Sequence, residues 1–137
     1  MTAVLSPQDA LVAVMIATSK VDNKQTEAEL RLIEAEISAL SAFNDYDLAR
    51  IPGINTLVDE VLEEEDGIDA LIGLVQQALP DRFNETAYAL ACDIAAADGH
   101  VNMSELRFLE IVRHDLKVGR LASAAIERGA RARHQRF

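Results

Sequence analysis

Apolar residues recur every three or four positions through most of this chain. The clearest stripes fall within 30–40, 57–62, 68–79 and 106–116. This spacing places side chains on one face of an α-helix, whereas a half-buried strand would alternate apolar and polar residues. No segment shows such an alternation over a β-branched run. The pattern therefore predicts an all-α fold.

Capping signals indicate where the helices begin and end. Ser6 precedes a proline suited to the first helical position. Thr26–Glu29 and Asn102–Glu105 have the arrangement of a capping box. Gly119 follows a stripe, where glycine commonly ends a helix. The predicted helices are 6–21, 26–41, 45–50, 53–64, 67–79, 84–97, 102–117 and 120–133. Because every connection is short, we expect one compact bundle of about seven or eight helices, a single domain covering 1–137.

The sequence contains an internal repeat. Residues 10–40 align without a gap on residues 86–116, and seven of the 31 aligned positions are identical. The identities concentrate where an acidic turn leads into the second helix of each unit. A helix–turn–helix unit cannot bury its apolar face alone, but two units packed together can. We therefore predict that the two units are related by a pseudo-twofold axis.

Charge limits the functions to consider. The net charge is −10, which argues against nucleic acid as the main partner. The last twenty residues are the exception, because they carry five arginines and one glutamate. No signal-peptide pattern and no apolar run of about 20 residues is present, so we expect a cytoplasmic protein. No phosphate-binding glycine loop, nucleophile elbow or HExxH motif indicates an enzyme.

One stretch of the second unit resembles a known family. The run Ala95–Val101, which contains Asp98-Gly99, is followed by Glu105-Leu106 and is similar to the hallmark of TerB-like tellurite-resistance proteins. The first unit carries a degraded copy in which Asn23 replaces the glycine, and asparagine tolerates the left-handed backbone next best. The resemblance implies an all-helical protein of tellurite resistance and wider chemical-stress response. It also implies work with partner proteins at the inner face of the membrane and a metal-binding role.

Four acidic residues occupy equivalent places in the two units: Asp22, Glu29, Asp98 and Glu105. Each glutamate is the third residue of a helix, where it caps the helix end and favours its positive dipole. Each aspartate can hold a turn by accepting backbone N–H groups. The second interpretation is ligation of calcium or magnesium, which prefer oxygen donors. We expect Arg31 and Arg107 to pair with Glu34 and Glu110, three residues along, leaving the turn carboxylates without a cationic partner.

Two further features carry candidate chemistry. Cys92 is the only cysteine and aligns with Ile16, so we expect a buried, inert thiol. In the basic tail, Arg128, Arg131 and Arg133 are candidates for docking on an acidic partner or an anionic membrane, and charge reversal there should leave stability nearly unchanged.

Two functions remain open from the sequence. The first is a TerB-like stress-response module that binds a divalent cation, partner proteins, or both. Its partners would be other stress-response or membrane-associated proteins, with peripheral contact to the inner face of the membrane. The alternative is a purely structural protein–protein interaction module that binds no metal. A metal-dependent change in stability separates the two.

Overall fold

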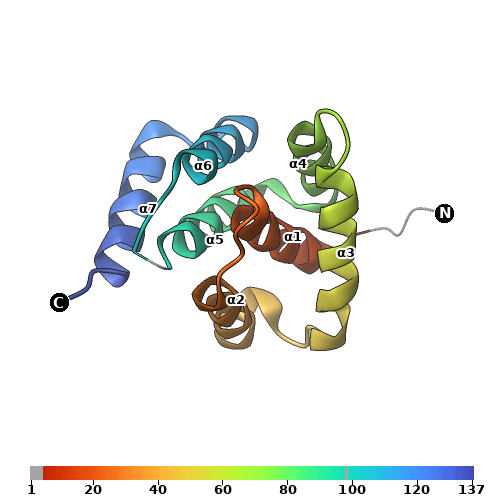
Figure 1. Cartoon of the computed structure of the whole chain (residues 1–137), viewed down its shortest axis with the longest axis horizontal. Helices are drawn as coiled ribbons and strands as arrows, with labels where there is room; N and C mark the ends of the chain where they lie inside the picture. The colour runs from red at the N-terminus through yellow and green to blue at the C-terminus, as the bar shows by residue number, and fades with distance from the viewer. Residues whose placement is uncertain (1–4, 98) are drawn as a thin grey trace.

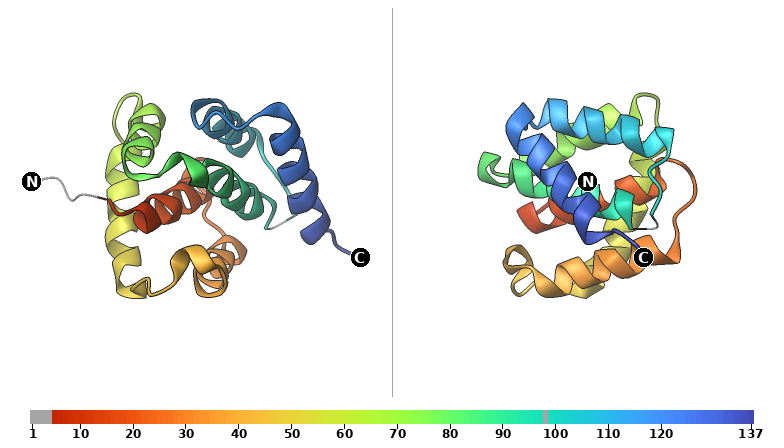
Figure 2. Two further views of the ribbon diagram at one scale, coloured as in Figure 1. Left: turned by 180° about the vertical axis from the view of Figure 1, so that it is seen from behind. Right: turned by 90° about the vertical axis from the view of Figure 1, so that its left-hand side faces the viewer.

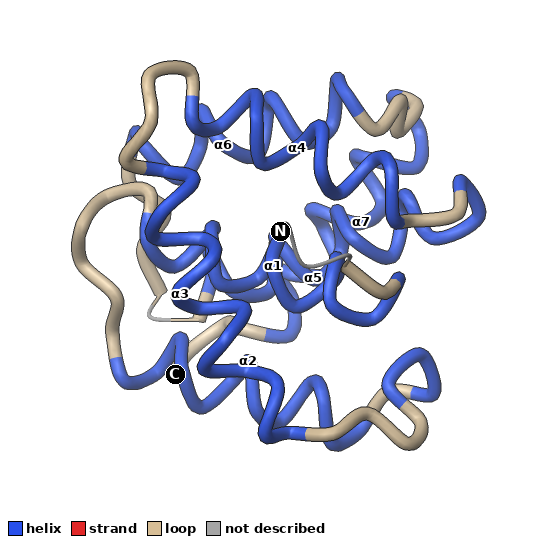
Figure 3. Tube along the Cα trace, turned by 90° about the vertical axis from the view of Figure 1, so that its right-hand side faces the viewer, coloured by secondary structure: helices blue, strands red, loops and turns tan. Residues whose placement is uncertain are grey.

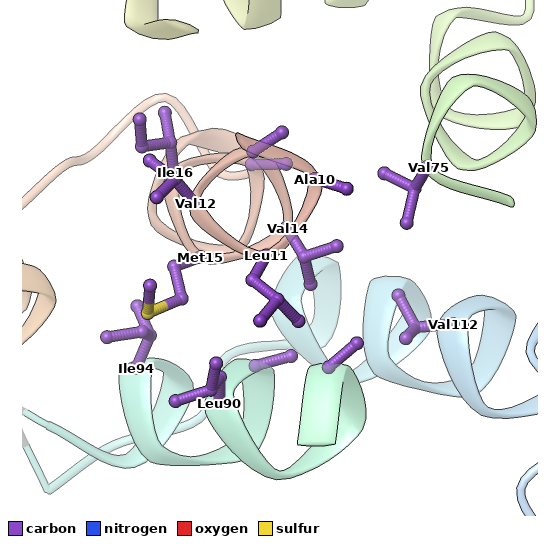
Figure 4. Close-up of a cluster of buried hydrophobic side chains, with 14 of the residues drawn as sticks. Ala10, Leu11, Val12, Val14, Met15, Ile16, Val75, Leu90, Ile94 and Val112 are labelled. Carbon is purple, nitrogen blue, oxygen red and sulfur yellow. The ribbon is translucent and has the colours of Figure 1, made fainter. Parts of the chain in front are cut away.

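Helix α1 (Pro7–Lys20) is buried on every side, and residues 9–19 all lie in the interior. Its sequence explains this position, because alanines and aliphatic residues surround the whole helix rather than one stripe. Helix α5 (Asn84–Ala96) is built in the same way and packs along α1. In Figure 4, Met15 of α1 points toward Leu90 and Ile94 of α5. The α1–α5 pair is therefore the centre of the core.

The other helices surround this pair. They are α2 (Glu27–Ala39), α3 (Ile51–Leu62), α4 (Gly67–Ala78), α6 (Met103–Asp115) and α7 (Arg120–Arg133). Figure 1 and the rear view in Figure 2 show α3 and α4 on one side of the central pair and α6 and α7 on the other. Each of these helices contributes an apolar face, such as Leu71, Ile72 and Val75 of α4. The core thus consists of aliphatic side chains around two helices rich in small residues.

The computed structural model describes residues 5–97 and 99–137, which form seven α-helices and no strand in that part of the chain (Figure 3). The all-α prediction is confirmed, and each long helix lies within two residues of its predicted ends. The predicted helix 45–50 is wrong. A single 3₁₀ turn, η2 (Leu48–Arg50), takes its place. Another, η1 (Ser41–Phe43), follows α2, and a third, η3 (Asp81–Phe83), precedes α5.

The predicted stop at Gly119 is also wrong. Helix α6 ends at Asp115, and Lys117 adopts the left-handed conformation with φ 56°. Gly119 has an extended backbone and is the N-cap of α7. A lysine therefore takes the strained turn position that the sequence assigned to glycine. Among the described helices, none is long and apolar enough to cross a membrane.

The two predicted repeat units form helix pairs with equivalent ends. Shifting α2 by 76 residues places it on α6, from Met103 to Asp115. Both helices begin with a capping box, from Thr26 and from Asn102. The pseudo-twofold relation between the pairs stays a prediction.

A buried aspartate anchors the start of α1. Asp9 is fully buried, closes the Ser6 capping box, and accepts hydrogen bonds from Arg50 Nε and from the Tyr46 hydroxyl, each at 2.9 Å. Burial alone would raise the pKa of Asp9, but the bonds from Arg50, Ser6 and Tyr46 outweigh it and lower the pKa to about 2. The segment between α2 and α3 is thereby tied to the central helix.

Candidate functional site

The two acidic turns share one local geometry. Asn23 and Gly99 both adopt left-handed backbone conformations, with φ 62° and 85°. This agrees with the expectation that Asn23 stands in for a glycine. The helix that follows each turn is closed by a capping box in which the glutamate at the third position accepts the N–H of the cap residue. In both units, the capping box therefore places the side chain of a glutamate next to the turn that precedes its helix.

Both capping glutamates are buried. Glu29 and Glu105 each retain only 2% of their exposure. Glu29 Oε1 accepts the backbone N–H of Thr26 at 2.8 Å and its hydroxyl at 3.0 Å. Glu105 Oε1 accepts the backbone N–H of Asn102 at 3.3 Å. A helix cap on a protein surface is normally solvated, so this depth of burial exceeds what capping requires.

The turn of the first unit lies next to the start of α6 in the second unit. Asn102 Nδ2 donates to Asp22 Oδ2 at 2.5 Å, which links the cap of the second unit to the turn of the first. Asp22 Oδ1 meanwhile accepts the backbone N–H of Lys24 at 2.9 Å. The turn-forming role expected for Asp22 is therefore confirmed, and a contact between the units is added to it.

Glu105 is the electrostatically unusual member of this group. Burial raises its pKa, and the nearby carboxylates of Glu29 and Asp22 raise it further, to about 8, against the opposing effect of the Asn102 backbone bond. Its second oxygen, Oε2, is buried and has no hydrogen-bond partner among the described residues. Near neutral pH a proton therefore resides on Glu105, and it reduces the repulsion between the two buried carboxyl groups.

The remaining predicted ligands do not join this pair in the described structure. Asp98 lies outside the described residues. Asp22 is adjacent, but both of its oxygens are already hydrogen-bonded. Within residues 5–97 and 99–137, no three His, Cys, Asp or Glu side chains converge in an arrangement that could hold a metal ion. The chemistry in view is thus a buried carboxyl pair with one oxygen unpartnered.

The predicted pairs of Arg31 with Glu34 and of Arg107 with Glu110 do not form in the described structure. Arg31 pairs with Glu27, one turn earlier, at 3.3 Å and not with Glu34. Arg107 forms no ion pair within the described part of the chain. Within the described residues, neither Glu29 nor Glu105 lies within ion-pair distance of a cationic side chain.

Cys92 is buried, as predicted, with 5% of its surface exposed. Burial raises the pKa of its thiol to about 12, although a hydrogen bond with Tyr88 partly opposes this. A thiol with so little thiolate at neutral pH is a poor nucleophile. The prediction of a core cysteine is therefore supported both by its position and by its electrostatics.

The tail arginines do not behave as one group. Arg133 is not a free docking residue, because its Nη2 lies 2.6 Å from Oδ1 of Asp93, a carboxylate with 9% exposure on α5. His134 lies 3.4 Å from the same oxygen. Arg128 and Arg131 are exposed and form no ion pair within the described residues. A charged residue on an otherwise apolar helix requires a partner, so the position of Asp93 in the sequence could have predicted an ion pair.

Comparison with known proteins gives one match. The sequence profile of the family described as tellurite resistance protein TerB matches residues 8–128 of the 137-residue chain. The matched region includes both acidic turns and all helices except the first residue of α1 and the last residues of α7. No curated protein and no solved structure matches the chain.

Proposed function

The chain belongs to the TerB family of tellurite-resistance proteins. We propose that it is a stress-response module that binds a divalent cation at the Glu29–Glu105 pair. The observation that carries the proposal is the buried, unpartnered Oε2 of Glu105 beside a second buried carboxylate. Helix capping accounts for one oxygen of each glutamate. The other oxygen of Glu105 can carry the proton that is hydrogen-bonded to Glu29, and a cation would replace that proton.

The donor set fits a hard cation. Carboxylate oxygens are preferred by calcium and magnesium, and magnesium is commonly bound through one or two carboxylates while it keeps several waters. The two glutamates would supply carboxylate donors, and other ligands would have to fill the remaining positions around the ion. Asp22, and Asp98 from the sequence pattern, would contribute negative charge around the pair. Glu105 would have to release its proton before it could bind the ion, so cation and proton compete for this place.

One substitution separates ligation from capping. Glutamine serves at the third position of a capping box as well as glutamate does. Glu105→Gln therefore keeps the cap of α6 and removes only the charge, whereas Glu105→Ala removes both. Glu34→Gln is the matched control, because Glu34 is an exposed glutamate on α2 without a partner in the described structure.

Thermal unfolding with chelator, calcium or magnesium tests the proposal. We expect calcium or magnesium to raise the unfolding midpoint of the wild type, by mass action on the folded state. The rise should be larger at pH 8 than at pH 6, because fewer protons then compete. Glu105→Gln should abolish it, Asp98→Ala should reduce it, and Glu34→Gln should leave it unchanged. Unfolding curves of the wild type that are identical in chelator and in millimolar cation would eliminate cation binding.

In that event the interaction module without a metal becomes the better function. Its support is the exposed pair Arg128 and Arg131 on α7, which have no ion-pair partner in the described chain. Charge reversal of these two residues should then reduce co-purification of partner proteins or co-sedimentation with anionic membranes. Arg133 is not part of this test, because it is bound to Asp93.

A further inference from the structure

A groove runs between α6 and α7. Helix α5 packs against both of them, whereas α6 and α7 make little contact with each other. The space between them above α5 has a volume of about 690 Å³. Both views in Figure 2 show the two helices on the same side of the molecule, joined by a short connection. We call this space the α6–α7 groove.

The wall of the α6–α7 groove is mainly aliphatic. It is lined by Ala96, Val101, Leu106, Leu109, Ala124 and Ala130. Val101 and Leu106 keep 47% and 43% of their surface exposed, so the groove leaves large apolar side chains in contact with water. The apolar lining and the volume are both typical of small-molecule sites, which usually measure about 300 to 1,000 Å³.

The charge around the groove is the reverse of that of the protein. Four arginines line it, Arg113, Arg120, Arg131 and Arg136, against two glutamates, in a chain of net charge −10. One of the glutamates, Glu127, is already occupied by a hydrogen bond of 2.7 Å from the Tyr88 hydroxyl.

Two of these arginines mark one end of the groove. Arg113 lies in the last turn of α6 and Arg120 is the first residue of α7, so both flank the connection between the helices. Neither forms an ion pair in the part of the chain that the structure describes. This end therefore presents two uncommitted cations next to an aliphatic wall.

The size of the groove decides between occupants. A helix with its side chains is about 10–12 Å across, so a single turn of about 5.4 Å fills roughly 400–600 Å³. The groove would enclose little more than one turn, so a docked peptide helix would leave most of its surface outside it. A slender aliphatic chain with an anionic end fits within the volume and matches the arginines.

We propose that the α6–α7 groove binds an anionic single-chain amphiphile, a long-chain carboxylate. Its carboxylate lies between Arg113 and Arg120, and its chain extends along Leu106, Leu109 and Ala124. This site is separate from the glutamate pair, and neither site depends on the other.

Calorimetric titration with octanoate, decanoate and dodecanoate below their micelle concentrations tests the proposal. Affinity should rise with chain length by up to about fourfold for each buried methylene. Dodecyltrimethylammonium, which has the same chain with a cationic end, should bind at least tenfold more weakly than dodecanoate. Amide chemical-shift changes should concentrate on residues that line the groove.

Variants locate the two halves of the ligand. The double variant Arg113→Gln/Arg120→Gln should weaken dodecanoate at least tenfold, and Ala124→Trp should block it by filling the groove. The control is Arg107→Gln/Arg128→Gln, which removes two exposed arginines of the same helices that do not line the groove. This control should bind normally.

Three results would overturn the proposal. One is equal affinity for the anionic and cationic amphiphiles. Another is full dodecanoate affinity in both the arginine double variant and the Trp variant, with circular dichroism confirming that they are folded. The third is binding to phosphatidylglycerol vesicles without binding of free dodecanoate, which would make the groove a membrane contact instead.

Discussion

Glu105→Gln is expected to change how the stability of the protein depends on pH. The carboxyl of Glu105 is 2% exposed, and burial together with its acidic neighbours raises its pKa from 4.5 to about 8. The folded state therefore holds a proton that the unfolded chain releases above pH 4.5. Stability from this group is fully present below pH 4.5 and is lost as the pH rises toward 8.

The magnitude follows from proton linkage. One proton bound only in the folded state changes the free energy of unfolding by about 1.4 kcal/mol per pH unit. Between pH 6 and pH 8 the wild type should therefore lose about 2 kcal/mol through this one group. Glutamine is neutral at every pH, so Glu105→Gln should lose correspondingly less. It should be more stable than the wild type at pH 8 and close to it at pH 5.

Urea denaturation in chelator at pH 5, 6, 7 and 8 measures the effect, with free energies from linear extrapolation. Chelator is needed because a bound cation would replace the proton. Glu34→Gln, on the exposed face of α2, controls for the loss of a surface charge and should follow the wild type. If Glu105→Gln and the wild type lose stability in parallel from pH 6 to pH 8, the raised pKa of Glu105 and the proton placed on it are both refuted.

Three further outcomes are expected from other buried groups. Arg133→Gln should lower the free energy of unfolding in urea by about 2 kcal/mol, because it removes charge-assisted bonds to the buried carboxylate of Asp93. Arg128→Gln should change it by no more than about 0.5 kcal/mol. Equal effects of the two substitutions would contradict the Arg133–Asp93 ion pair. Asp9 has a pKa lowered to about 2, so the wild type should lose about 2 kcal/mol between pH 4 and pH 2, and Asp9→Asn should show a much flatter acid limb. Cys92 should react with a thiol reagent far more slowly in the native protein than in urea, and equal rates would show that it is exposed.

The sequence by itself determined the helices, because the signals that specify them are local. A capping box needs only residues three apart, and an apolar stripe needs only a few turns of helix. The same holds for the left-handed turn at Asn23, since the tolerance of asparagine for this conformation is a property of the residue. Residues 9–19 of α1 are buried on every side of the helix, so Cys92, which aligns with Ile16 of α1, is also buried.

Only the tertiary structure decided the electrostatics. Glu29 and Glu105 are 76 residues apart, and the raised pKa of Glu105 depends on burial and on carboxylates that packing brings near. The prediction that Arg133 is available for docking was wrong for the same reason, because its ion-pair partner Asp93 lies 40 residues away on another helix. Spacing along the chain specifies which face of a helix a side chain occupies. What that face meets depends on how α1 and α5 pack and where the other helices then lie, and burial and distance set the energy of every charge.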